Sequence, residues 1–261
     1  MRILLAVLAV VAVWGAVVQY RRFTDGAESA AYSPATCRER PCVLFVGNSL
    51  TFVNELPVVF QRLARSGGHE ITAEDESVGG FTLLDHARRP MTRKVIDDSP
   101  WDVVVLQEQS LVPAVREWRE ASTVEAGRDL ASWVRRAGAR PLLFMTWPRE
   151  RGVPEIGLPS YTALRRAVIE GYREAGRDLG VQVVPVGVAW DLATRRRDVP
   201  PLWSDGNHPT MAGTYLAACV FYAAILGENP AGIEFRAGLP EHVAAVLQRI
   251  AWDAARAERA G

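Results

Sequence analysis

The sequence predicts an α/β fold, in which helices pack on both faces of a parallel β-sheet. Short apolar segments that end in turn residues alternate five times with longer stretches of helical periodicity. Repeats of this kind imply parallel crossovers, and therefore a three-layer α/β/α arrangement. The chain has 261 residues, of which 49% are hydrophobic and 23% are charged, so its composition suits a globular protein with an ample core.

The predicted strands are short apolar runs bounded by glycine, proline or polar residues. They span residues 42–47, about 70–77, 102–107, 141–146 and 182–186. The run at 102–107 reads DVVVLQ and shows almost no polar alternation, which is typical of a strand that is buried on both faces. We therefore expect this strand near the centre of the sheet.

The predicted helices lie between and after these strands, where apolar residues recur at intervals of three and four. They span residues 55–66, 82–97, 117–137, 160–179, 208–226 and 240–258. In open α/β sheets, ligands bind at the carboxyl ends of the strands. The residues that follow each strand are therefore the ones that should carry any chemistry.

The first 22 residues differ from the rest of the chain. An uncharged apolar run over residues 3–18 is preceded by Arg2 and followed by Arg21 and Arg22. Its length lies between that of a signal-peptide core and that of a membrane-spanning helix. We predict an uncleaved transmembrane signal anchor, with a cleaved signal peptide as the alternative, and hence a membrane-anchored or exported protein. Residues 23–41 are predicted as a polar linker, and residues 42–261 as one folded domain.

Charge and cysteine content exclude some classes of partner. The 30 basic residues balance the 30 acidic ones, so no excess of positive charge favours a nucleic acid as partner. Neither the three cysteines nor the four histidines show the spacing of a metal site, and we expect no metal. Cys37 and Cys42 could form a disulfide if the chain is exported, whereas Cys219 lies in an apolar helical stretch and is expected in the core.

Residues that could act together lie at or just after the ends of three predicted strands and at the start of a helix near residue 208. Ser49 follows the first strand, Gly80 the second and Gln107 the third, while Asp205 and His208 stand at the start of the helix near 208. A serine hydroxyl is a weak nucleophile unless a base lies within hydrogen-bonding reach, and histidine is suited to that role. A carboxylate can then fix the orientation of the imidazole, as in serine proteases.

These residues resemble the sequence blocks of the SGNH hydrolases, the GDSL-type esterase/lipase superfamily. Gly47-Asn48-Ser49-Leu50 stands in place of the Gly-Asp-Ser-Leu block, Gly80 matches the glycine of the second block, and Asp205 and His208 match the Asp-x-x-His block. The resemblance extends from residue 43 to about residue 227. It implies a five-stranded, flavodoxin-like parallel sheet and a catalytic triad of Ser49, Asp205 and His208.

The third block departs from the family pattern. Where the family shows Gly-x-Asn, this chain shows Gln107-Glu108-Gln109-Ser110. The resemblance implies an oxyanion hole formed by the backbone N–H groups of Ser49 and Gly80 and by a glutamine amide. We assign that amide to Gln107, because it lies at the strand end, with Gln109 as the alternative. Glu108 is expected to be ion-paired or solvated.

The resemblance implies a hydrolase that cleaves carboxylic esters through an acyl-enzyme on Ser49 and needs no cofactor. The absence of a lid-like insertion favours an O-acetylated saccharide or another small acyl ester as substrate. Asn48, Gln109 and Trp147, which lie on the same rim of the sheet, are candidates for substrate binding. Two other functions stay open. One is a lysophospholipase or thioesterase, and the other is a catalytically idle module of the same fold that binds a glycan or a lipid.

Overall fold

The structure, a computed structural model, describes Cys37 and residues 41–260. The predicted signal anchor and nearly all of the predicted linker lie outside these residues. Within the described part, no helix is both long enough and apolar enough to cross a bilayer.

Five parallel strands form one sheet in the order β2-β1-β3-β4-β5, the flavodoxin-like order that was predicted. The central position of β3 is also confirmed, since it pairs with β1 on one side and β4 on the other. The strands span Cys42–Gly47 (β1), Thr72–Ser77 (β2), Val103–Gln107 (β3), Arg140–Phe144 (β4) and Gln182–Val184 (β5).

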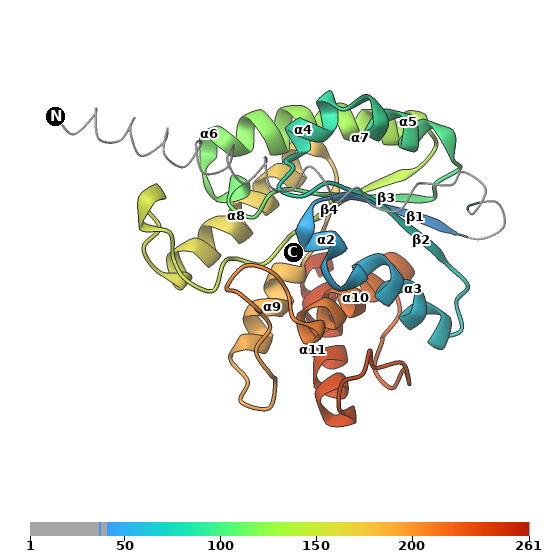
Figure 1. Ribbon diagram of the computed structural model, residues 1–261, viewed down its shortest axis with the longest axis vertical. Coiled ribbons are helices and arrows are strands. Elements are labelled where there is room, and N and C mark those ends of the chain that lie inside the picture. The colour runs from blue at the N-terminus through green and yellow to red at the C-terminus, as the bar shows by residue number, and fades with distance from the viewer. Residues whose placement is uncertain (1–36, 38–40, 261) are drawn as a thin grey trace.

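Helices cover both faces of the sheet (Figure 1). One layer contains α4 (Leu83–Arg88), α5 (Pro90–Asp98), α7 (Gly127–Arg136) and α8 (Tyr161–Leu179), and the other contains α3 (Leu56–Ser66), α9 (Val186–Thr194), α10 (Met211–Leu226) and α11 (Glu241–Ala260). Successive side chains of a strand point to opposite faces. Val43 and Phe45 therefore join the core under α3 and α10, whereas Leu44 and Val46 join the core under α4, α7 and α8.

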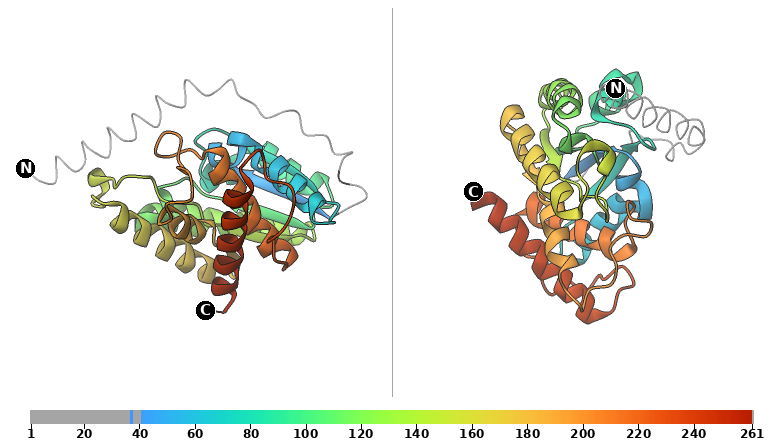
Figure 2. Two further views of the ribbon diagram at one scale, coloured as in Figure 1. Left: turned by 90° about the horizontal axis from the view of Figure 1, so that it is seen from below. Right: turned by 90° about the vertical axis from the view of Figure 1, so that its left-hand side faces the viewer.

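Helix α10 is apolar on all sides and nearly all of its residues are buried, because it lies between the sheet and α11. Figure 2 shows α11, in red, on the outer side of this layer. Cys219, on α10, is fully buried in this core, as predicted.

Three predicted elements differ from those observed. The helix expected over 82–97 is divided into α4 and α5, because the residue before Pro90 is held in an extended conformation. The helix expected over 117–137 begins with α6 (Arg116–Trp118) and a wider π-helical stretch (η3, Arg119–Ala126) before α7. The strand expected to reach residue 186 ends at Val184, and the apolar residues that follow form α9.

Short helices complete the chain in the connecting segments. These are α2 (Ser49–Phe52), η1 (Val53–Glu55), η2 (Val112–Ala114) and η4 (Pro154–Ile156).

Cys37 and Cys42 are both buried, and both are free thiols in the structure. Burial raises the pKa of the Cys37 thiol, and a hydrogen bond with Cys42 raises it further. Whether oxidation joins the two cysteines stays a prediction.

Candidate functional site

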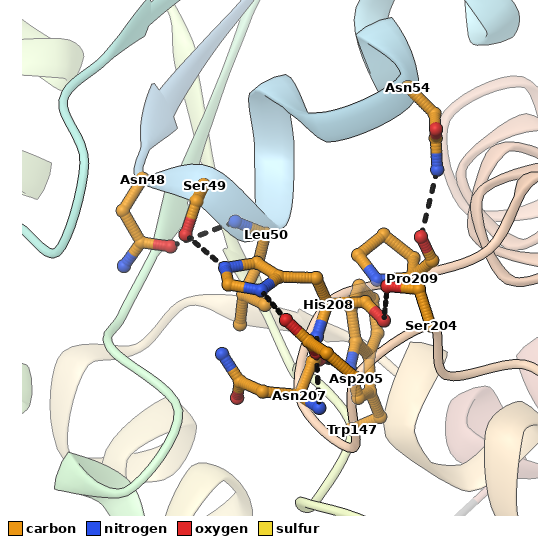
Figure 3. Close-up of polar contacts among 10 residues, drawn as sticks. All are labelled: Asn48, Ser49, Leu50, Asn54, Trp147, Ser204, Asp205, Asn207, His208 and Pro209. Carbon is orange, nitrogen blue, oxygen red and sulfur yellow. Dashed lines mark hydrogen bonds and ion pairs between the residues drawn. The ribbon is translucent and has the colours of Figure 1, made fainter. Parts of the chain in front are cut away.

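Ser49 lies directly after β1, at the first position of α2. Asn48 caps this helix, because its side-chain oxygen accepts a hydrogen bond from the backbone N–H of Leu50 at 3.1 Å. The sharp turn from strand to helix brings the Ser49 side chain to the carboxyl edge of the sheet (Figure 3).

Three predicted residues meet at this edge, although they come from distant parts of the chain. The Oγ of Ser49 lies 3.0 Å from Nε2 of His208, and Nδ1 of His208 lies 2.6 Å from an Oδ atom of Asp205 (Figure 3). Such a chain of hydroxyl, imidazole and carboxylate can draw the serine proton onto the imidazole while the carboxylate stabilises the imidazolium.

The Asp205 carboxylate is held in its charged form. Burial alone would raise the pKa of Asp205, but hydrogen bonds from the His208 ring and from the backbone N–H groups of His208 and Asn207 lower it to about 2. The carboxylate therefore remains ionised near neutral pH and can accept the Nδ1–H of His208, which fixes the imidazole tautomer.

Gln107 lies beneath the Ser49 turn and does not face the serine hydroxyl, contrary to the prediction that it donates to an oxyanion. It is 1% exposed, its Oε1 accepts hydrogen bonds from Asn48 N and Thr51 Oγ1, and its Nε2 donates to the Glu108 carbonyl. The fit to the turn is tight, since a Cβ on Gly47 would lie 2.5 Å from Gln107 Oε1. Gln107 therefore supports the turn from below.

Asn48 is 2% exposed and was predicted to contact substrate, but its side chain serves the protein itself. Its amide nitrogen donates to the Phe81 carbonyl at 2.8 Å, and the backbone N–H of Val78 donates to the Gly47 carbonyl. These two bonds fix the loop that carries Gly80 beside the Ser49 turn.

The backbone N–H groups of Ser49 and Gly80, both at this edge, have no acceptor among residues 41–260. Gly80 has a φ of +74°, a left-handed conformation in which a Cβ would be strained, although the surrounding space is open. The requirement for glycine here thus comes from the backbone conformation. Both N–H groups are free to donate to an incoming oxygen atom.

Glu108 is fully buried, where ion pairing or solvation had been expected. Its carboxylate accepts hydrogen bonds from Leu83 N, Gln109 N, Ser122 Oγ and Thr123 Oγ1. Burial raises the pKa of Glu108 to about 7, although these donors oppose the shift. Glu108 thereby joins the end of β3, the start of α4 and the π-helical stretch η3.

Gln109, the alternative amide, is half-buried. Its Oε1 accepts from Leu111 N at 2.8 Å, while its Nε2 hydrogen-bonds to no described residue.

His86 is a further buried group that the sequence motifs did not reveal. Its Nε2 donates to the Gly47 carbonyl at 2.8 Å, and burial lowers the pKa of His86 to about 4.

The loop that carries His208 is supported by tryptophan side chains in the same core as α9 and α10. Trp147, predicted as a pocket residue, is 1% exposed, stacks on Trp190 with ring centroids 4.1 Å apart, and donates from Nε1 to the Asn207 carbonyl. Trp203 donates to the Pro148 carbonyl. These contacts hold the His208 loop against the segment that follows β4.

Asn54 connects the two halves of the site (Figure 3). It lies just after α2 with a φ of +57°, and its amide nitrogen donates to the Pro209 carbonyl at 2.9 Å and to Thr214 Oγ1 at 3.0 Å. Asparagine tolerates this left-handed conformation better than most residues. No sequence motif marked Asn54, because its role depends on a contact across 155 residues.

Comparison with known proteins bears on the fold. No family model matches the sequence, and the search of curated proteins finds no match. A DUF4886 family protein from Bacteroides uniformis has a TM-score of 0.70 at 18% identity, over 83% of this chain and 95% of that one. A proposed SGNH hydrolase from Slackia heliotrinireducens has a TM-score of 0.57 at 27% identity, over 72% of this chain and 100% of that one.

The chain has the SGNH hydrolase fold. An acetyl xylan esterase shares this fold with a TM-score of 0.54 at 14% identity, over 70% of this chain and 99% of that one. At such identity the likeness concerns the fold alone. The predicted SGNH resemblance is confirmed at the level of the fold, and the predicted residues Ser49, Asp205 and His208 come together at the edge of the sheet where ligands of α/β proteins bind.

Proposed function

We propose that the protein is a serine hydrolase that cleaves carboxylic esters through an acyl-enzyme on Ser49. The observation that carries this proposal is the chain of hydrogen bonds from Ser49 through His208 to Asp205. A serine hydroxyl needs such a base to become nucleophilic near neutral pH. The common fold with known esterases supports the same reaction class.

In this proposal Ser49 Oγ attacks the ester carbonyl while Nε2 of His208 takes the hydroxyl proton. The negative charge that develops on the carbonyl oxygen meets the free backbone N–H groups of Ser49 and Gly80. The tetrahedral intermediate then collapses, and His208 gives its proton to the departing alcohol. Water, activated by His208, hydrolyses the acyl-enzyme in the second half of the reaction. Loss of one oxyanion donor typically costs about 10²- to 10³-fold in turnover.

The substrate that we propose is an O-acetylated saccharide or another small acyl ester. The fold shared with an acetyl xylan esterase supports this choice. The Asp205 side chain is 54% exposed, so the His208 side of the site is open enough for a bulky alcohol part. If residues 1–22 anchor or export the protein, it would meet such a substrate outside the cytoplasm.

A fluorophosphonate probe tests the nucleophile, because it reacts only with an activated serine. We expect the full-length protein to be labelled, Ser49→Ala to abolish labelling, and His208→Ala to slow it by about 10³-fold or more. Ser132→Ala and His242→Ala, which change a serine and a histidine on outer helices, are the matched controls. An unlabelled but folded protein would point to the idle binding module.

A series of p-nitrophenyl esters then tests the acyl group. We expect the highest kcat/KM for acetate and a decline as the acyl chain lengthens. A rise with chain length would contradict the acetyl ester and favour the lysophospholipase or thioesterase.

A further inference from the structure

Arg149 lies in the segment that follows β4 and runs along the His208 loop. On one side of it, Trp147 Nε1 donates to the Asn207 carbonyl at 2.9 Å. On the other side, the backbone N–H of Glu150 donates to the Gly206 carbonyl at 2.8 Å. Because these two bonds flank Arg149, its backbone is held beside the turn that joins Asp205 to His208.

The Arg149 guanidinium is half-buried and has no hydrogen-bonding partner in the part of the chain that the structure describes. Its Nε is inaccessible to solvent and hydrogen-bonds to no atom of residues 41–260, and no carboxylate in that part of the chain forms an ion pair with Arg149. Burial lowers the pKa of Arg149, while the charge of Asp205 raises it. An N–H group that is removed from water without an acceptor is unfavourable. Nε cannot itself be reached from outside, but Nη1 and Nη2 are accessible and have no partner among residues 41–260, so an acceptor from outside the protein can bind the guanidinium there.

Other half-buried arginines of this protein have carboxylate partners. Arg119 lies 2.6 Å from Glu174, and Arg165 lies 3.3 Å from Asp191. Asp205, the carboxylate whose charge acts on Arg149, already accepts three hydrogen bonds, from the His208 ring and two backbone N–H groups. Arg149 is therefore a positive charge near the triad that forms no ion pair of its own among residues 41–260.

We propose that Arg149 binds an anionic group, a carboxylate or a phosphate, in the alcohol part of the ester substrate. The guanidinium is the side chain best suited to both groups, because it can donate two parallel hydrogen bonds. His208 delivers a proton to the oxygen of the departing alcohol. The alcohol part of the substrate therefore lies on the His208 side of the site, which is also where Arg149 is located. This inference rests on the proposed ester hydrolysis and adds the charge of the substrate to it.

The test compares two esters that differ in one charge, 4-acetoxybenzoate and its neutral methyl ester. The readout is the ratio of kcat/KM for the anionic ester to kcat/KM for the neutral ester. We expect Arg149→Gln to lower this ratio by about 10- to 100-fold, which is the range for a lost hydrogen bond to a charged group. Arg149→Lys should restore part of it. Arg151→Gln, which removes an exposed arginine from the same segment, should leave the ratio unchanged.

An unchanged ratio in Arg149→Gln would overturn the proposal. An equal loss with both esters would also overturn it, since it would assign Arg149 to the support of Asp205 and His208. The same ratio can be measured with a carboxylate in the acyl part, using mono-p-nitrophenyl succinate and p-nitrophenyl butyrate. If Arg149→Gln lowers this second ratio instead of the first, the anion lies in the acyl part and the assignment to the alcohol part is rejected. Thermal melting of each variant checks that it is folded.

Failure of ester hydrolysis itself is distinguishable from failure of the anion site. If the wild-type protein cleaves neither ester, calorimetric titration with 4-hydroxybenzoate, the anionic alcohol product, measures the site alone. Binding that weakens about tenfold or more in Arg149→Gln supports the site. Equal binding to the two proteins, or none to either, rejects it.

Discussion

The two halves of the site are built by different means. The Ser49 half rests on buried polar side chains: Gln107 and Asn48, both almost inaccessible to solvent, connect the turn to β3 and to the Gly80 loop. The His208 half lies on a surface loop, where the side chain of His208 is 21% exposed and that of Asp205 is 54% exposed. Backbone hydrogen bonds and the flanking tryptophans hold this loop.

This difference predicts that substitutions in one half mainly change stability, whereas substitutions in the other half mainly change the rate of the reaction. A buried polar group that loses its partner destabilises the folded protein, because water cannot replace the lost hydrogen bond. An exposed group is easily resolvated, so its replacement changes the reaction more than the free energy of unfolding. Substitutions in the Ser49 half should therefore lower stability, and substitutions in the His208 half should lower activity alone.

The largest effect is expected from Asp205→Asn, in the exposed half. The amide would no longer accept the Nδ1–H of His208, so the imidazole would favour the wrong tautomer, and we expect kcat to fall by about 10³- to 10⁴-fold. The free energy of unfolding should change by less than about 1 kcal/mol, as for other exposed pairs. Ester kinetics and urea denaturation measure the two quantities. Asp198→Asn, at another exposed aspartate, should change neither, and a large loss of stability in Asp205→Asn would contradict the comparison.

A smaller effect, and one mainly on stability, is expected from Gln107→Ala. This change leaves Asn48 N, Thr51 Oγ1 and the Glu108 carbonyl without their partner. Each buried group left unpaired costs about 1–3 kcal/mol, so the midpoint of urea denaturation should fall measurably. Gln182→Ala, at an exposed glutamine on the edge strand β5, is the control and should be nearly neutral. Equal stabilities of the two variants would show that the Ser49 turn does not depend on Gln107.

The smallest effect concerns the pH dependence of stability. The raised pKa of Glu108 means that the folded protein holds a proton that the unfolded chain releases between pH 4.5 and about 7. The contribution of Glu108 is therefore fully present below pH 4.5 and is lost as the pH rises through 7, at up to about 1.4 kcal/mol per pH unit. Glu108→Gln should remove this slope, because an amide does not titrate. The Ser122 and Thr123 hydroxyls can rotate to accept from the amide, so the buried side chain keeps its partners.

Urea denaturation of the wild type and of Glu108→Gln from pH 5 to pH 8 measures this slope as the difference between their free energies of unfolding. His86 contributes in the opposite direction: its lowered pKa means that stability is lost as the pH falls from 6.5 towards 4. Since His86 is present in both proteins, its contribution cancels in the difference. Parallel stability curves for the wild type and Glu108→Gln would show that the pKa of Glu108 is not raised.

The sequence was sufficient for the sheet order and for the meeting of Ser49, Asp205 and His208. Both follow from the resemblance to the SGNH hydrolases, which rests on short motifs at element boundaries, whereas the apolar strands and turn residues indicate only the parallel three-layer arrangement. The side-chain directions at the end of β3 were not predictable in the same way. Gln107 points under the turn and Gln109 does not, a distinction set by the pairing of β3 with β1 rather than by the residues themselves.

Residues whose environment depends on distant segments were missed for a related reason. Asn54 acquires its partners from residues 209 and 214, and the segment that carries Arg149 is hydrogen-bonded to Gly206 and Asn207. Helix α9 was missed because its apolar residues lack the regular spacing of an amphipathic helix. In each case the sequence contains the residue but not the contact that determines its role.

The distance along the chain between Ser49 and His208 also has a consequence for biosynthesis. The two residues are separated by 159 positions, and four of the five strands of the sheet are synthesised between them, before His208 is reached. Contacts between such distant segments form late in folding, because a long loop must close first. A growing chain therefore holds its serine without its base, and reactivity would arise only after the segment that carries His208 has been synthesised and has folded against the Ser49 turn.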